Sequence, residues 1–246
     1  MGLISLSLRA FRCFDHAELE FSPEINLVCG ANASGKTSVL EGIFLIGRGR
    51  SFRSGHLDPV SRSGSKGFQA VAHVSTPFGT TTVGLGREQG SLKVRIGGRP
   101  AAGLAELAET LPVQLVDNQA HLLVDGSPRH RRQFVDWGVF HVEPAFIAVW
   151  RRYQRALQQR NTLLRGGRSA REIVGWDNEL AGSGELLDKF RRRYLEGFSR
   201  TAEQWAQGAL GEITVNLEYR PGWTEGQTLG EALAANRERD RQQGGT

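Results

Sequence analysis

The sequence feature that most constrains the fold is the segment at residues 30–37, which matches the Walker A pattern of a glycine, four variable residues and Gly-Lys-Thr. An apolar run at residues 25–29 precedes it and is expected to be a buried strand, and residues 36–47 have the pattern of an amphipathic helix. A glycine-containing loop between a strand and a helix presents backbone N–H groups and the positive end of a helix dipole to phosphate. The pattern therefore predicts a nucleotide phosphate site on an α/β fold.

The chemistry of this loop gives roles to its residues. Lys36 is expected to reach the β- and γ-phosphates of ATP, and the hydroxyl of Thr37 is expected to ligate Mg²⁺. An ordinary glycine-containing turn is the alternative, and the flanking strand and helix patterns argue against it. The predicted ATP-binding residues are Gly30, Ala31, Asn32, Ala33, Ser34, Gly35, Lys36 and Thr37.

Hydrophobic periodicity predicts a β-rich first half and a helical second half. The expected strands lie at residues 2–8, 16–21, 68–75, 79–85, 91–96 and 112–116, the first two as a hairpin and the next three as an antiparallel meander, with a short helix at 103–110. Two long helices are expected at about 144–165 and from 170 to about 207, the second with a loop around residues 181–184. Such a pair predicts a helical hairpin.

Composition shifts near residue 126 from neutral and β-like to basic and helical. We therefore expect residues 1–126 to form an ATPase core with the Walker A loop, and residues 127–210 to form a basic helical lid. Residues 211–246 are expected to return to the core with a strand at 213–219 and a helix at 228–242.

The positive charge is concentrated in the helical region. The chain has 31 Lys and Arg against 26 Asp and Glu, and residues 129–200 alone contain fifteen basic and eight acidic side chains, a local excess of seven. This block predicts a polyanionic partner such as DNA, with solvated helix faces as the alternative. Three arginines near a helix start oppose its dipole and need a partner such as Asp136 or a phosphate. The candidate DNA contacts in this region are Arg129, Arg131, Arg132, Arg151, Arg152 and Arg155.

Other features exclude several classes of protein. No run approaches 18 apolar residues, so we expect no membrane span, and the N-terminus lacks the pattern of a secretory signal. Cys13 and Cys29 are too few for a disulfide scaffold or a metal cage, which favours a reducing cytoplasm. Asp117 and Asp125 end apolar runs, but we interpret them as a strand end and a turn rather than as the carboxylate that hydrolysis requires.

Several motifs in the same order resemble the RecF and SMC-like group of ABC-type ATPases. The opening segment at 8–12, the phosphate loop with Asn32, and residues 39–43 (Val-Leu-Glu-Gly-Ile) carry the general resemblance. The segments that narrow it to the RecF family are Gly-Arg-Ser-Phe-Arg at 49–53, Gly-Ser-Pro at 126–128, Arg-Arg-Gln-Phe-Val-Asp-Trp at 131–137, and the region 153–164, which resembles the first lid helix of the family.

This resemblance implies an α/β, ABC/SMC-like P-loop NTPase core with an antiparallel β-meander and an inserted helical-hairpin lid. It also implies ATP and Mg²⁺ as cofactors, an ATP-dependent homodimer, and binding to single- and double-stranded DNA. RecR-like and RecA-like partners are implied as well, with a role in recombinational repair, replication-fork maintenance and the SOS response.

Residue by residue, the resemblance makes Arg12 a candidate nucleotide contact, Gln119 a candidate magnesium contact, and Arg50 and Arg53 candidate contacts to DNA or triphosphate.

The sequence departs from the family pattern at two places. Ala33 occupies a position where many relatives have glycine, and alanine is tolerated there if its φ is negative. The pair at 118–119 (Asn-Gln) stands where the family often has proline followed by an acidic residue.

Relatives in the family continue past the position of residue 246, and that part carries the signature loop and the Walker B carboxylates. The chain is therefore expected to be truncated and to hydrolyse ATP poorly or not at all. The alternatives are a P-loop kinase acting on a small acceptor and a non-hydrolysing DNA-binding module. A kinase does not account for the strand pair before the phosphate loop or for the basic helical hairpin.

Overall fold

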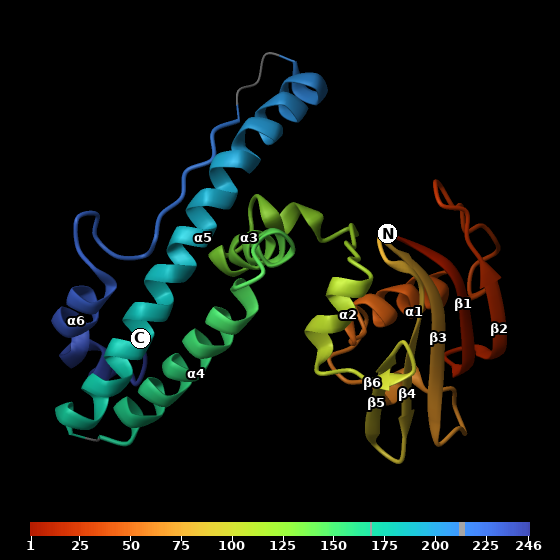
Figure 1. Ribbon diagram of the computed structural model, residues 1–246, viewed down its shortest axis with the longest axis horizontal. Coiled ribbons are helices and arrows are strands. Elements are labelled where there is room, and N and C mark those ends of the chain that lie inside the picture. The colour runs from red at the N-terminus through yellow and green to blue at the C-terminus, as the bar shows by residue number, and fades with distance from the viewer. Residues whose placement is uncertain (168, 212–214) are drawn as a thin grey trace. The chain divides into compact units, whose positions relative to one another are not determined.

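A computed structural model describes residues 1–167, 169–211 and 215–246 (Figure 1). The chain divides into two units, Met1–Asn118 and Gln119–Thr246. The first combines a sheet with helices, and the second is helical. Among the described helices, none has both the length and the apolar content that a bilayer crossing requires.

The first unit is built on a six-stranded antiparallel sheet with strand order β2-β1-β3-β4-β5-β6. Its strands are β1 (Gly2–Phe11), β2 (Phe14–Glu20), β3 (Gly67–Thr76), β4 (Gly79–Glu88), β5 (Ser91–Ile96) and β6 (Arg99–Pro100). Every second residue of β3, from Phe68 to Val74, is buried, which is the period of two that predicted these strands. The predicted hairpin and meander are confirmed.

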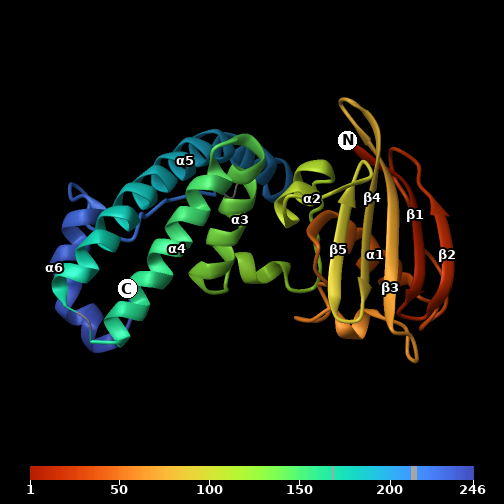
Figure 2. The same ribbon diagram turned by 60° about the horizontal axis from the view of Figure 1, so that its bottom comes forward.

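One face of this sheet is covered by α1 (Lys36–Arg48), with α2 (Leu104–Thr110) beside α1 (Figures 1 and 2). The apolar side of α1 joins the sheet core, where Leu45 and Ile46 are fully buried. Gly42 permits this close packing, because a Cβ at that position would lie 2.9 Å from Cδ2 of Leu8. The predicted helix at 36–47 is confirmed, and packing on β1 fixes the position of its N-terminal end.

Two strands predicted for this unit are wrong. Residues 25–29 and 112–116 are not in strands, and Ile25 and Leu27 are 89% and 86% exposed. Both runs have the composition of buried strands, but a strand also needs a hydrogen-bonding neighbour. None of the described strands pairs with either run. Composition alone therefore overestimated the sheet.

The described residues of the second unit form four helices and a short 3₁₀ segment. They are η2 (Ala120–Leu123), α3 (Pro128–Val142), α4 (Phe146–Arg165), α5 (Ala170–Leu210) and α6 (Leu229–Gln243). α4 and α5 run side by side as the predicted hairpin, and α6 packs against both (Figure 1). Two small apolar clusters hold these helices together: Val139, Phe146, Val149 and Leu187 in one, and Ala156, Leu180 and Leu233 in the other.

Two predictions for this unit need correction. The loop expected around residues 181–184 is wrong, because α5 is continuous there. Gly184 serves packing instead, since a Cβ at this position would lie 2.4 Å from Cδ2 of Leu229 on α6. The strand predicted at 213–219 falls partly on residues 212–214, which lie outside the described residues, and residues 215–219 are not in a strand. The helix predicted after it is confirmed as α6.

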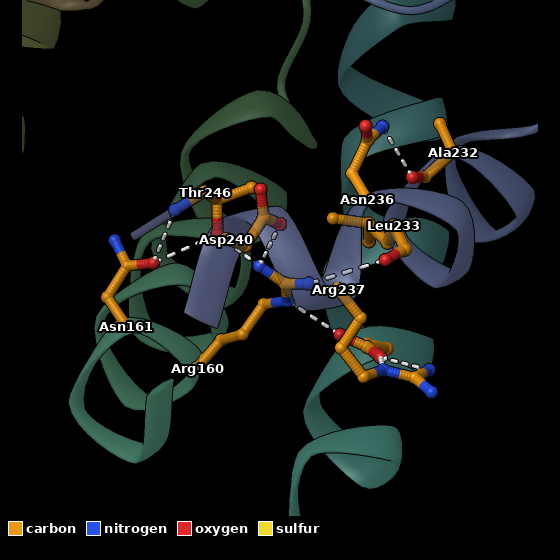
Figure 3. A network of polar contacts seen from close by, with 9 residues as sticks. Arg160, Asn161, Ala232, Leu233, Asn236, Arg237, Asp240 and Thr246 are labelled. Carbon is orange, nitrogen blue, oxygen red and sulfur yellow. Dashed lines mark hydrogen bonds and ion pairs between the residues drawn. The ribbon is translucent and has the colours of Figure 1, made fainter. Parts of the chain in front are cut away.

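A buried network of charges joins α4, α5 and α6 (Figure 3). Arg160 of α4 is fully buried and donates through Nε to Oδ1 of Asp177 at 2.6 Å and through Nη1 to Oδ2 of Asp240 at 2.8 Å. Arg237 of α6 donates through Nη2 to the other carboxylate oxygen of Asp177 at 2.8 Å. Two arginines and two aspartates balance in charge, so the helices are connected without an uncompensated buried ion.

Removing one member of this network is expected to destabilise the helical unit. Arg160→Ala removes the cation that pairs with the buried Asp240 and leaves Asp177 with Arg237 alone, which should lower the free energy of unfolding by about 3–5 kcal/mol. Denaturant unfolding followed by helical circular dichroism measures this. Arg220→Ala is the control, because Arg220 and its partner Glu218 are both exposed. Equal effects of the two substitutions would contradict a structural role for the network.

Candidate phosphate-binding site

The phosphate loop turns sharply into α1 at two glycines. Gly30 has φ 150° and Gly35 has φ 98°, a region that side chains disfavour. Gly35 also lies against the turn between β1 and β2, since a Cβ there would be 2.5 Å from Cζ of Phe14. Conformation and space therefore both require glycine at position 35.

The N-terminus of α1 is suited to an anion. Its N-cap residue, Gly35, has no side chain to accept a hydrogen bond from the first turn, and the first turn contains no acidic residue. The backbone N–H groups of a first turn have no acceptors within the helix, and together with the helix dipole they favour negative charge. This helix end therefore offers the electrostatic environment that a phosphate needs.

Lys36 folds back over the loop. Its Nζ donates to the carbonyl oxygens of Gly30 at 2.8 Å and Ala31 at 2.7 Å. The ammonium group thus lies at the loop and is held by neutral acceptors. A phosphate oxygen would give a stronger, charge-assisted hydrogen bond in their place. Thr37, the candidate magnesium ligand, follows in the first turn and is exposed.

Ala33 departs from the expected backbone. Its φ is +63°, whereas tolerance of alanine in place of glycine was expected from a negative φ. A non-glycine residue in the left-handed region costs about 1–2 kcal/mol, because its Cβ approaches the following carbonyl. The loop therefore stores strain at this position, as ligand-binding loops often do.

Arg12 is held beside α1 by a buried carboxylate. Its Nε donates to Oε2 of Glu41 at 2.8 Å, and its Nη2 donates to Oε1 at 2.6 Å. Its Nη1 donates to the carbonyl oxygen of Pro59 at 2.5 Å. The side chain of Glu41 is fully buried. Sequence reasoning missed Glu41, although an acidic residue on the apolar face of a predicted helix was a visible signal.

The same carboxylate organises the segment after α1. The hydroxyl of Ser51 donates to Glu41 and accepts from the backbone N–H groups of Arg53 at 3.0 Å and Ser54 at 3.1 Å. Arg53 also places Nη1 3.6 Å from Oε2 of Glu41. Of the predicted residues, the structure thus brings Arg12 and Arg53 together on one carboxylate, whereas Arg50 is an exposed residue of this segment.

The predicted basic residues of α3 have different environments. Arg131 uses Nη1 to donate to the carbonyl oxygens of Val124 at 3.1 Å and Gly126 at 2.9 Å, so it stabilises the turn before α3. Asp136, suggested beside a phosphate as a partner for these first-turn arginines, accepts from Nε of Arg191 of α5 at 2.7 Å. Of the two partners suggested for these arginines, Asp136 is thus paired with α5, and a phosphate stays a prediction. Arg129 and Arg132 are exposed.

The three arginines predicted as a stripe on α4 are all exposed. Arg152 is paired, donating through Nε to Glu179 at 2.8 Å, and this hydrogen bond lowers the pKa of the Glu179 carboxyl. Arg151 and Arg155 are four residues apart on the helix, and the described residues include no salt bridge to either of them. These two arginines therefore offer charge that an external anion can use.

The remaining candidates lie near residue 118 in the sequence, where the first unit ends. Asp125 is in a turn after η2, as predicted, whereas Asp117 does not end a strand. Gln119, the candidate magnesium contact, is the N-cap residue of η2 and the first residue of the second unit. Within the described residues, no three His, Cys, Asp or Glu side chains gather into a metal-binding cluster.

Comparison with other sequences gives matches over the whole chain. A family model described as AAA domain matches residues 5–69. The DNA replication and repair protein RecF of Pseudomonas entomophila (strain L48) is 42% identical over 249 residues, covering 100% of this chain and 68% of the relative. The protein of the same name from Aliivibrio fischeri (strain MJ11) is 40% identical over 248 residues, covering 100% of this chain and 69% of the relative.

Solved structures give the same result for the fold. One described as "Structure of the recombination mediator protein RecF-ATPrS in RecFOR pathway" has a TM-score of 0.89 at 21% identity, covering 99% of this chain and 70% of that chain. A second, of RecF-ATP, has a TM-score of 0.86 at 20% identity. The predicted α/β, ABC/SMC-like P-loop NTPase fold is confirmed.

The strain at Ala33 gives a testable prediction. Ala33→Gly should raise the free energy of unfolding by up to about 1.5 kcal/mol, because relief of about 1–2 kcal/mol exceeds the added freedom of glycine in the unfolded chain, about 0.4–1 kcal/mol. Ala31→Gly is the matched control, since Ala31 has no positive φ, and it should lower stability. A loss of stability in both variants would contradict the strain.

Proposed function

Because this chain belongs to the RecF family of DNA replication and repair proteins, we propose that it binds ATP with magnesium at residues 30–37 and binds DNA through its helical unit. These activities would serve recombinational repair and replication-fork maintenance. The kinase alternative is not retained, because the family match extends over the whole chain.

The observation that carries the ATP proposal is the geometry of the phosphate loop. Two glycines with positive φ turn the backbone into an uncapped helix N-terminus, and Lys36 lies against the carbonyl oxygens of the same loop. Binding would move the ammonium group of Lys36 from these carbonyls to phosphate oxygens. Thr37 would ligate magnesium through its hydroxyl.

The proposal concerns nucleotide binding rather than hydrolysis. Hydrolysis of ATP needs a group that orients the attacking water. Glu41 is the buried carboxylate on the phosphate-loop helix, and it already accepts hydrogen bonds from Arg12 and Ser51. Its lone pairs are directed at these partners, so Glu41 is a structural acceptor and not a general base.

For DNA, support comes from the exposed arginines that the helices do not use internally. Arg151 and Arg155 of α4 meet this description, and Arg129 and Arg132 of α3 are exposed as well. Many other basic residues of the block are paired, such as Arg160 and Arg191. The proposed DNA surface is therefore smaller than the count of arginines implies.

Family membership is the support for three further proposals. The first is an ATP-dependent homodimer, and the second is partnership with RecR-like and RecA-like repair proteins. The third is the division of the chain into an ATPase core at 1–126, a helical lid at 127–210 and a segment at 211–246, although α6 of that segment packs on α4 and α5 rather than returning to the core.

The ATP proposal predicts a large effect of the loop lysine. Lys36→Ala should raise the Kd for fluorescently labelled ATP with magnesium about 10- to 100-fold, since it removes a charge-assisted hydrogen bond. Lys66→Ala, which removes an exposed lysine elsewhere in the same unit, should leave the Kd unchanged. Saturable binding with the same Kd in the Lys36 variant would refute the site.

The DNA proposal predicts a change in salt dependence. The double variant Arg151→Ala/Arg155→Ala should reduce the slope of log K against log salt by about 1.8 on duplex DNA, because each phosphate that an arginine neutralises contributes about 0.9 to that slope. Fluorescence anisotropy between 50 and 200 mM salt, roughly the range in which such contacts weaken, measures the slope. Arg220→Ala is the control, because Arg220 pairs with Glu218. A slope equal to that of the parent protein would exclude α4 as the DNA surface.

A further inference from the structure

Glu41 lies at the centre of a compact charged cluster on the phosphate-loop helix. Its buried carboxylate receives two hydrogen bonds from Arg12, one from Ser51, and an ion pair from Arg53 at 3.6 Å. Glu41 follows Thr37 by four residues, so the two side chains lie on the same side of α1, one turn apart. The carboxylate is thus fixed one helical turn from the candidate magnesium ligand.

The cluster contains more positive than negative charge. Arg12 and Arg53 share the single carboxylate of Glu41, which leaves one positive charge uncompensated within the cluster. A guanidinium has five N–H donors, and Arg12 uses three of them on Glu41 and Pro59, so two remain. Arg53 is 44% exposed and lies beyond hydrogen-bond distance of Glu41, so its donors are accessible from solvent.

The cluster also lies close to the phosphate loop. Cys13, the neighbour of Arg12, has its Sγ 3.8 Å from Oγ of Ser38 in the first turn of α1. A Cβ at Gly35 would lie 3.0 Å from the same sulfur atom. The turn that carries Arg12 is therefore in contact with the residues that cap and begin the helix.

We propose that Glu41 is a positioning residue for nucleotide binding: it fixes the Arg12 guanidinium and the 51–54 turn so that Arg12 and Arg53 present their remaining donors to the phosphates of ATP. This inference rests on the proposed ATP site. Positioning and a simple charge effect predict opposite changes in the affinity for ATP when Glu41 loses its charge. Removing a negative charge near the site should strengthen anion binding by Coulomb attraction alone, whereas loss of positioning should weaken it.

The test is Glu41→Gln in the full chain, titrated with fluorescently labelled ATP and magnesium. Glutamine has the same shape, but it is neutral and cannot accept the bidentate pair from Arg12. We expect the Kd for ATP to rise about tenfold, the loss typical of one hydrogen bond to a charged group. We also expect Glu41→Gln to weaken ATP binding less in an Arg12→Ala background than in the parent chain, because only the contribution of Ser51 and Arg53 then remains to be lost. A tighter or unchanged Kd, or full additivity with Arg12→Ala, would overturn the proposal.

A matched control and a second variant make the result decisive. Glu106→Gln changes a carboxylate of the same unit that also binds an arginine, Arg99, and it should not alter ATP binding.

If Glu41→Gln does not fold, Arg12→Lys keeps the charge and removes the bidentate geometry. This variant should weaken ATP binding about fivefold, roughly the loss of one weak hydrogen bond, and an unchanged Kd would overturn the inference.

The outcomes also separate this inference from the ATP proposal. Absence of saturable ATP binding by the parent chain would refute the ATP site and, with it, the role of Glu41. Binding that is lost in Lys36→Ala but retained in Glu41→Gln and Arg12→Lys would refute the role of Glu41 alone.

Discussion

The site depends on how firmly the N-terminus of α1 is held against the β1–β2 hairpin. Gly42 lets α1 pack onto Leu8, and Gly35 lets the helix start against Phe14. The two hydrogen bonds from Arg12 to Glu41 then tie the end of β1 to the second turn of the helix. A helix dipole favours an anion only where the first turn is ordered, so these contacts determine whether the loop can act as a phosphate site.

In the helical unit, many charged side chains form ion pairs that connect one helix to another. Arg160 and Arg237 compensate Asp177 and Asp240 inside the helix bundle, and Arg191 compensates Asp136. Because a buried ion without a partner is costly, these pairs specify which helices meet. Arginines such as Arg151 and Arg155, for which the described residues include no salt bridge, therefore contribute most to the field that an external polyanion experiences.

Local patterns predicted the elements whose stability is largely local. The helix at 36–47, the meander and the helical hairpin were all correct, because each has its periodicity and its stop signals within its own segment. The strands at 25–29 and 112–116 were wrong, because pairing depends on residues far away in the sequence. The loop was identified from its motif. Glu41 was missed, because an acidic residue on the apolar face of a helix signals a buried carboxylate but does not identify its partners, Arg12 and Ser51.

The most direct test of the central claim is amide hydrogen exchange of residues 30–37 with and without ATP and magnesium. If these backbone N–H groups enclose the phosphates, their exchange should slow markedly on addition of nucleotide, while the amides of the β4–β5 turn at 88–91 stay unchanged. Equal exchange rates at 30–37 in both states, at nucleotide concentrations that saturate any binding signal, would contradict the account.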